Sequence, residues 1–310
     1  MRAIVIGAVE SSRVAIEAIA AAPGWTIPAV VSLPTALAAR HADFVDLAPA
    51  ASAAGAQMLR ARNVNDAVTL EAIAAMRPDY IFVIGWSQIC GPAFRALLPD
   101  RIIGYHPAAL PRLRGRAVIP WTILAGEPIT GGTLFWIDEG VDSGAILAQR
   151  FFHVAPDETA TTLYARHMAE LGAMLGQALG PLAGDDPPRL VQDERHATWA
   201  ARRTPADGEL DWSRPAADLD RLIRAVTHPY PGAWTATATF PLTIWRAHRD
   251  PDGHRHRATP GQVIAVADNT FSVMCGDGAA LTVTQWSSPD GAMPRQHSFL
   301  KLPGKGRPNA

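Results

Sequence analysis

Short apolar runs alternate with helically spaced apolar positions along the first 180 residues of the chain. The run that ends at Gly7 predicts a strand, and Ser11 or Ser12 can cap the helix that follows it. The same alternation predicts further strands over 27–31, 80–84, 102–105, 133–137 and 145–152, with helices over 14–22, 66–76, 94–98 and 159–179. Buried strands that alternate with helices favour a parallel sheet covered on both faces. We therefore expect an α/β domain with a Rossmann-like, mostly parallel sheet.

The pattern changes beyond residue 183. Residues 183–207 carry Gly, paired Asp and paired Pro, and their few periodic apolar positions indicate a linker. A helix is then predicted over 215–226, followed by five short strands separated by turn signals, at 233–239, 242–247, 261–266, 270–274 and 279–286. Five short strands favour a small OB-like β-barrel. The expected organisation is a catalytic domain over 1–185, a linker over 186–206 and a C-terminal domain over 207–310.

Composition narrows the possible partners. With 310 residues, 48% hydrophobic and 18% charged, the chain can bury cores for about two domains. The net charge of −1 provides no field that would attract nucleic acid or an anionic membrane. Cys90 and Cys275 lie far apart and match neither a disulfide framework nor a zinc site. Because no signal peptide or membrane-spanning run is found, a cytoplasmic protein is expected.

Candidate chemistry lies where predicted strands end, because ligands of such sheets collect beyond the carboxyl ends of the strands. The first of these loops has only Gly7, so it lacks a dinucleotide fingerprint. His106 leaves a strand into a loop stiffened by Pro107 and Pro111, and residues 138–144 form a turn with three acids. These residues could form a proton-transfer pair. They could equally be a structural histidine and a solvated turn, and the residues alone leave both interpretations open.

Two longer motifs carry a family resemblance. Residues 106–115 read His-Pro-x-x-Leu-Pro-x-x-Arg-Gly, Pro-Trp follows at 120–121, and residues 138–144 read Asp-Glu-Gly-x-Asp-x-Gly. These resemble the formyltransferase family that uses 10-formyltetrahydrofolate. The stretches 209–212 and 225–233 are similar to second-domain motifs of methionyl-tRNA formyltransferases and of the formylating half of aminoarabinose-modifying enzymes. The resemblance covers most of the chain.

The resemblance implies a catalytic set of Asn, His and Asp beside a folate cleft. His106 and Asp142 match this set, whereas Gly104 occupies the position of the Asn. In such a set the imidazole moves the amine proton, while the carboxylate fixes the ring and stabilises its protonated form. The missing amide would hold the developing oxyanion, and losing one such donor typically costs on the order of 10²–10³ in rate. Ser87 and Gln88 are the candidates to replace it.

The resemblance also implies a binding site for the formyl donor, 10-formyltetrahydrofolate. Its pterin is expected to pair with backbone groups around two segments, made of Gln88, Ile89 and Cys90 and of Asp138, Glu139, Gly140, Val141 and Asp142. Arg116 and Ser87 are expected to contact the other substrate, and no metal is required. For Cys90, the interpretation as a small buried hydrophobic residue remains open.

The acceptor is expected to be a small amine. Residues 201–310 carry 13 basic and 10 acidic residues, and the segment 32–48 has only Arg40 and His41 against Asp43 and Asp46. This weak basic surplus disfavours transfer RNA, whose phosphates demand clustered cations. The resemblance favours a nucleotide-linked amino sugar as the acceptor. Hydroxyornithine is the alternative small amine, and Met-tRNA is the alternative macromolecular acceptor.

Two other functions stay open at this stage. Because Gly104 replaces the amide donor, the chain could bind folate or sugar without turnover. Hydrolysis of formyltetrahydrofolate is less favoured, since the chain begins with the first strand of the catalytic domain and lacks the extra N-terminal domain of such hydrolases. The sequence does not indicate an oligomeric state.

Overall fold

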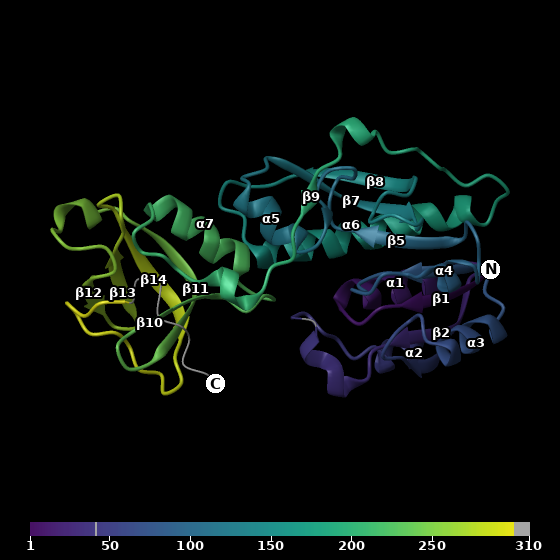
Figure 1. Ribbon diagram of the computed structural model, residues 1–310, viewed down its shortest axis with the longest axis horizontal. Helices are drawn as coiled ribbons and strands as arrows, with labels where there is room; N and C mark the ends of the chain where they lie inside the picture. Colours follow the sequence, from purple (N-terminus) through teal and green to yellow (C-terminus); the bar gives the residue numbers. More distant parts are fainter. Residues whose placement is uncertain (41, 301–310) are drawn as a thin grey trace. The chain divides into compact units, whose positions relative to one another are not determined.

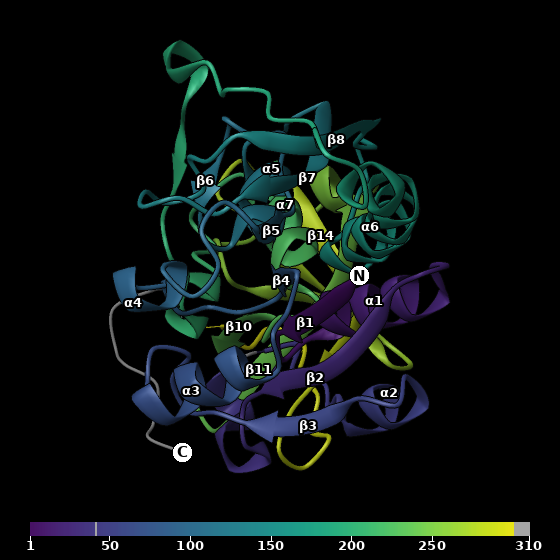
Figure 2. The ribbon, with the colours of Figure 1, turned by 90° about the vertical axis from the view of Figure 1, so that its right-hand side faces the viewer.

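A seven-stranded sheet organises the first part of the chain, and the computed structural model describes residues 1–40 and 42–300 (Figures 1 and 2). The strand order is β3-β2-β1-β4-β5-β7-β8. The strands are β1 (Arg2–Ile6), β2 (Thr26–Ser32), β3 (Gln57–Arg60), β4 (Tyr80–Val83), β5 (Ile102–His106), β7 (Ile129–Trp136) and β8 (Ile146–His153). The first five pair in parallel, whereas β7 is antiparallel to both β5 and β8. The predicted mixed α/β fold with a mostly parallel sheet is confirmed.

Helices cover both faces of this sheet. Figure 2 shows α1 (Glu10–Ala21), α2 (Ala48–Ala53) and α6 (Ala160–Leu182) on one face, with α3 (Ala67–Ala75) and α4 (Pro92–Arg95) on the other. Side chains alternate across a strand, so Ala3 and Val5 pack in one core and Ile4 and Ile6 in the other. This double burial explains why β1 reads as a continuous apolar run in the sequence.

Helix α1 begins four residues earlier than the apolar spacing predicts. Its N-cap is Val9, and Ser12 lies in the first turn instead of capping the helix. The Ser12 hydroxyl accepts a hydrogen bond from the Val9 N–H (3.2 Å) and donates one to the Ile84 carbonyl (2.6 Å). These bonds tie the start of α1 to the end of β4, because a polar side chain there satisfies backbone groups at the carboxyl edge of the sheet.

The edge strand β3 was not expected from the sequence. Its four residues are exposed or only partly buried, so they lack the apolar run that marks the central strands. The short helix α2 and the 3₁₀ turn η1 (Thr35–Arg40) lie before it in the chain. Within the segment 32–48, His41 lies outside the described residues.

An antiparallel sheet forms the C-terminal part, in the order β10-β11-β14-β13-β12. Its strands are β10 (Ala233–Ala236), β11 (Pro241–Asp250), β12 (Val263–Ala267), β13 (Thr270–Met274) and β14 (Ala280–Ser287). Helix α7 (Ala216–Val226) packs on β11, burying Leu219, Leu222 and Ile223. Within the described residues no pairing joins β10 to β12, so the sheet is not closed by hydrogen bonds and the OB-like barrel stays a prediction.

The chain divides into two compact units that share some segments. The first comprises Met1–Val118, Pro128–Val154 and Tyr164–Ala201, and the second Ile119–Glu127, Ala155–Leu163 and Arg202–Ala310. All of helix α5 (Val118–Leu124) except its first residue, together with the first turn of α6, thus contributes to the second unit. Among the described helices, none combines the length and the apolar character that crossing a bilayer requires.

Candidate active site

His106 closes β5 at the carboxyl edge of the parallel strands, and its side chain is buried (5% exposed). Its Nε2 atom lies 2.7 Å from the carbonyl oxygen of Leu113. A carbonyl oxygen only accepts hydrogen bonds, so this contact assigns the proton to Nε2. In the neutral ring, Nδ1 is therefore the nitrogen with a free electron pair, and it is the atom that can accept a proton.

Asp142 reaches the same nitrogen from the turn between β7 and β8. Its Oδ2 atom lies 3.5 Å from Nδ1 of His106 and accepts a hydrogen bond from the N–H of Gly115 (2.8 Å). Asp138 organises the turn, because its Oδ1 accepts hydrogen bonds from the Gly140 N–H (3.0 Å) and the Ser143 hydroxyl (2.8 Å). Of the three acids in this turn, the structure brings only the third beside the histidine.

The geometry differs from the expectation that Asp142 fixes the ring. The Leu113 carbonyl holds the imidazole, while the Gly115 N–H holds the carboxylate. A neutral His106 has no proton on Nδ1 to offer Asp142, but a protonated ring has N–H groups facing both the Leu113 carbonyl and the carboxylate. The site is thus arranged to accept a proton at Nδ1 and to stabilise the resulting cation.

The loop that supplies both backbone contacts has an unusual conformation. Leu113 (φ 57°), Gly115 (φ 109°) and Ala117 (φ 54°) all have positive φ, which costs a non-glycine residue roughly 1–2 kcal/mol. The loop is held by pairing between β6 (Arg114–Gly115) and β9 (Trp199–Ala200). A side chain at Gly115 would also meet the backbone of β9. Contacts from a distant segment therefore hold the loop in this conformation.

The loop after β4 contains the first predicted folate-binding segment. The side chain of Gln88 is committed to the neighbouring loop, accepting from the N–H of Val64 (3.0 Å) and donating to the carbonyl of Arg62 (2.7 Å). This commitment argues against Gln88 as the donor that replaces the missing amide. Ser87, the other candidate, is exposed in this loop.

The remaining residues of this loop differ in exposure. Ile89 is 74% exposed, whereas Cys90 is buried, and burial raises the pKa of its thiol to about 12. This protonated thiol fits the interpretation of Cys90 as a small hydrophobic residue. Asn65, which the sequence analysis missed, holds the loop by donating to the Ile89 carbonyl (2.9 Å) and accepting from the Gly91 N–H (2.7 Å).

A second histidine lies on the other side of β5. The Tyr105 hydroxyl lies 3.1 Å from Nδ1 of His167 in α6. Burial, with a smaller contribution from His106, lowers the pKa of His167 to about 3, so this ring is neutral. Its Nε2 atom has no hydrogen-bond partner within the described part of the chain. His167 is therefore a buried neutral residue whose protonation would oppose folding.

Comparison with known families identifies the chain. A family model described as "Formyl transferase" matches residues 4–179, and one described as "Formyl transferase, C-terminal domain" matches residues 202–303. The chain belongs to the formyl transferase family. The motifs around His106 and Asp142 lie within the first match.

Solved structures share the fold at low identity. HypX from Aquifex aeolicus, in complex with tetrahydrofolic acid, is 17% identical, with a TM-score of 0.67, covering 97% of this chain and 46% of that protein. An N-formyltransferase from Helicobacter canadensis, in complex with folinic acid and dTDP-3-aminofucose, is 16% identical, with a TM-score of 0.66, covering 91% and 98%. Methionyl-tRNA formyltransferase from Clostridium thermocellum is 18% identical, with a TM-score of 0.59, covering 81% and 94%. The chain thus spans under half the length of HypX.

Gly104 departs from the pattern that the family resemblance implies, and the structure shows what fills its surroundings. It precedes His106 by two residues on the same face of β5. A Cβ atom at this position would lie 2.8 Å from Cε1 and Cζ of Phe135 and 3.3 Å from Cγ1 of Ile137. Phe135 is itself buried, so its ring on β7 fills the space that a side chain at residue 104 would need.

The other predicted binding residues of this family member lie on exposed loops. Arg116 is exposed after β6, while Glu139, Gly140 and Val141 form the exposed part of the turn before Asp142. Val141 is a large apolar residue that is 54% exposed, as Ile89 is on the other loop. The binding roles of these residues remain predictions.

Two buried polar residues of the site were not singled out from the sequence. Arg114 is 3% exposed and Gln192 is 5% exposed, although both types usually face solvent. Arg114 lies inside the quoted motif, so its position was a usable signal. Gln192 lies in the segment with linker composition, where no periodicity marked it.

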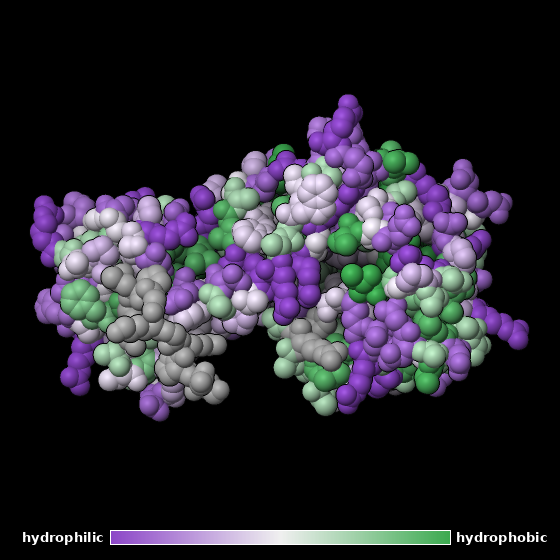
Figure 3. All heavy atoms as spheres, in the orientation of Figure 1, coloured by the Kyte–Doolittle hydropathy of each residue, from purple (hydrophilic) through white to green (hydrophobic). Residues whose placement is uncertain are grey.

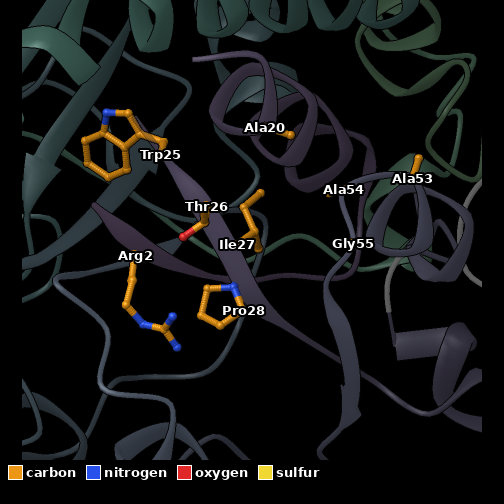
Figure 4. A pocket seen from close by; sticks show the side chains of 9 residues that line it. All are labelled: Arg2, Ala20, Trp25, Thr26, Ile27, Pro28, Ala53, Ala54 and Gly55. Carbon is orange, nitrogen blue, oxygen red and sulfur yellow. The ribbon is translucent and has the colours of Figure 1, made fainter. Parts of the chain in front are cut away.

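A separate hollow of about 420 Å³ lies at the amino ends of the parallel strands β1 and β2 (Figure 4). Its lining includes Arg2 and Thr26, which begin β1 and β2, whereas His106 ends β5. The Arg2 guanidinium donates to the Met76 carbonyl (2.8 Å). The hollow is therefore distinct from the His106 site.

Proposed function

We propose that this chain transfers the formyl group of 10-formyltetrahydrofolate to the primary amine of a small molecule, through chemistry in its first unit. One observation carries the proposal: Nδ1 of His106 lies 3.5 Å from Oδ2 of Asp142. Both residues lie in motifs within the region that the formyl transferase family model matches. These two residues lie 36 positions apart in the chain: His106 is the last residue of β5, and Asp142 lies in the turn that joins β7 to β8.

His106 acts as the base at Nδ1. It accepts the proton that the attacking amine loses as the new bond between nitrogen and the formyl carbon forms. The formyl donor supplies the carbonyl carbon, and its nitrogen leaves with the electron pair of the broken bond. His106 then returns the proton from Nδ1 to that departing nitrogen, so the ring ends in its starting state and no net proton is consumed.

Asp142 and Leu113 stabilise the ring while it is protonated. The Leu113 carbonyl accepts from Nε2 throughout, and the Asp142 carboxylate compensates the positive charge at Nδ1. The Gly115 N–H keeps the carboxylate oriented. Positioned acid–base groups of this kind typically contribute on the order of 10²–10⁴ in rate.

The residues of the two loops suit a flat, partly apolar ligand. Ile89 and Val141 each expose a large apolar side chain at these loops, which can pack on the flat face of a pterin. The loop around Ile89 is held from behind by Asn65, so its backbone is preorganised. These residues would hold the pterin of the formyl donor. HypX and the Helicobacter canadensis enzyme, both complexes with folates, support this choice of donor.

A nucleotide-linked amino sugar is the proposed acceptor. The support is the dTDP-3-aminofucose complex of a chain of similar length and fold, together with the weak basic surplus of residues 201–310. Purified protein would be incubated with 10-formyltetrahydrofolate and one amine at a time: dTDP-linked amino sugars, hydroxyornithine and Met-tRNA. We expect the amino sugars to give the highest kcat/KM. Preferential formylation of Met-tRNA or hydroxyornithine would overturn this acceptor.

A second candidate function is binding without transfer, and Gly104 favours it. The space beside Gly104 is filled by Phe135, so no amide side chain can hold the formyl oxygen from this position. A protein of this kind would bind folinic acid in calorimetry but release no formyl group to any amine. In that case His106→Ala would leave binding intact and change no rate. Measurable transfer that is lost in His106→Ala would exclude this alternative.

A further inference from the structure

The segment that follows α6 returns to the site before it leaves the first unit. In Figure 1 it passes β8 and descends through β9. Leu190 forms an antiparallel bridge with Ile146 of β8, and β9 pairs with β6 in the loop beside His106. Between these two anchors lie Gln192 and the exposed turn η2 (Glu194–His196), which forms the hydrophilic projection at the top of Figure 3. The segment 190–200, part of the stretch with linker composition, is thus held by strand pairing at both ends, with the buried amide of Gln192 between them.

Gln192 links the two loops of the site through its side-chain amide. The amide nitrogen donates to the carbonyl of Asp142 (2.8 Å) and to that of Gly144 (2.7 Å). The amide oxygen accepts from two nitrogens of the Arg114 guanidinium, at 3.2 and 2.8 Å. Rotating the amide by 180° would place its oxygen against two carbonyls, so the network fixes its orientation. Both donors and the acceptor are used, with the group almost fully buried.

Arg114 completes the connection. Its guanidinium also pairs with Glu194 (2.6 and 2.9 Å), and this hydrogen bonding lowers the pKa of the Glu194 carboxyl. The neighbours of Arg114 in the chain supply the two backbone groups of the site: the Leu113 carbonyl that holds His106 and the Gly115 N–H that holds Asp142. Whatever positions Arg114 therefore also positions the contacts of both reacting side chains.

We propose that Gln192 is a positioning residue, which with Arg114 sets the separation of His106 and Asp142. The expected effect on kcat rests on the proposed transfer function, whereas the hydrogen bonds of Gln192 do not depend on it. Gln192 touches neither ring nor carboxylate, and it acts by tying the Asp142 turn to the loop that holds His106. Removing the Gln192 amide takes away the acceptor of two Arg114 nitrogens and the donor of two buried turn carbonyls, so the turn shifts to find water. A displacement of about 1 Å can cost on the order of 10²-fold in rate.

The test compares Gln192→Met, of similar length but without the amide, with Arg195→Met as the matched control. Arg195 lies three residues further along the same segment, its side chain is 85% exposed, and its guanidinium pairs with Asp193 instead of with Arg114 or the Asp142 turn. We expect Gln192→Met to lower kcat by ~10–100-fold with little change in the KM for the formyl donor, and Arg195→Met to stay within ~3-fold of the natural chain. A normal kcat in folded Gln192→Met, or equal losses in both variants, would overturn the proposal.

A double-variant cycle separates positioning from a general loss of structure. In an Asp142→Asn background, Gln192→Met should cost less than ~3-fold, because the residue through which it acts is already removed. If Gln192→Met lowers kcat in this background as much as it does in the natural chain, Gln192 does not act through Asp142. Gln192→Glu supplies a second fold-preserving variant, since it keeps the acceptor for Arg114 but replaces the donors to the turn with oxygen. We expect the same loss of kcat from it.

A readout without turnover distinguishes failure of this proposal from failure of the proposed function. Nitrogen-15 NMR of labelled histidine, with His106→Gln to assign the signal, reports whether Nδ1 or Nε2 of His106 carries the proton. We expect the Nε2–H form in the natural chain and a mixture of forms in Gln192→Met. Unchanged His106 signals in Gln192→Met would refute the positioning role, even for a chain that transfers no formyl group. Changed signals in an inactive chain would uphold it and refute only the proposed function.

Discussion

Gly104 offers a quantitative test of the steric reasoning, through the substitution Gly104→Ala. The added Cβ would lie 2.8 Å from two ring carbons of Phe135, about 0.6 Å inside ordinary carbon contact. The ring is only 5% exposed, so it cannot turn away without disturbing its neighbours. Overpacking of this kind costs roughly 1–3 kcal/mol, from which the lower chain entropy of alanine subtracts about 0.5–1 kcal/mol. The mid-range values give an expected net loss of about 1 kcal/mol in the free energy of unfolding, with an upper bound of about 2.5 kcal/mol.

The assay is urea unfolding followed by tryptophan fluorescence and circular dichroism, with Gly176→Ala as the control. Gly176 lies inside α6, and apart from its chain neighbours and the backbone of its own helix no atom lies within 4 Å of an added Cβ, so this change should stabilise by about 0.5–1 kcal/mol. Gly104→Asn should destabilise more than Gly104→Ala, and Phe135→Leu should relieve part of that cost. Destabilisation of Gly104→Asn that simply adds to that of Phe135→Leu would refute the proposed coupling.

The same pair of changes also has a functional outcome. In Gly104→Asn with Phe135→Leu, an amide lies where the family resemblance places one, on the His106 face of β5. A single oxyanion donor is typically worth on the order of 10²–10³ in kcat, so we expect the double variant to transfer faster than the natural chain if it remains folded. An equal or lower kcat would mean that another group already stabilises the formyl oxygen.

Three further predictions concern proton transfer and buried groups. His106→Gln and Asp142→Asn should each lower kcat by ~10²–10⁴-fold, and the double variant should lose little more than the worse single variant. Steady-state kinetics of the three variants would test this. Losses that add in the double variant would contradict a joint role. Burial lowers the pKa of His167 to about 3 from 6.5, so its contribution to stability is complete above pH 6.5 and declines as the pH falls toward 3. Between pH 7 and pH 5 we expect a loss of ~2 kcal/mol in urea unfolding that His167→Gln abolishes, whereas an unchanged slope would refute a neutral His167. Burial raises the pKa of the Cys90 and Cys275 thiols to about 12, so both should react with a disulfide reagent at pH 8 only after unfolding.

Much of the first unit could be predicted because its central strands are buried on both faces. Their apolar runs, such as the one ending at Ile6, mark the strands without help from tertiary contacts. The edge strand β3 was missed for the complementary reason, since its residues are half exposed. The pairing order of the C-terminal strands depends on contacts distant in sequence, which local patterns do not encode.

The candidate site shows the same division. His106 and Asp142 carried a signal because each follows a predicted strand in a motif-bearing loop. Their tautomeric arrangement could not be predicted, because it depends on the Leu113 carbonyl, which any residue in that conformation would present. Gln192 was missed because one buried amide in a polar segment looks like a solvated one until its partners are known.

The most direct test of the account is a single-turnover measurement of tetrahydrofolate release from 10-formyltetrahydrofolate, with and without a dTDP-linked amino sugar. We expect rapid release from the natural chain only when the amine is present, with the formyl group recovered on the amine, and release slowed at least ~100-fold in Asp142→Asn. Equal release without amine would indicate hydrolysis. No release under either condition would contradict the assignment of His106 and Asp142 as the pair that drives transfer.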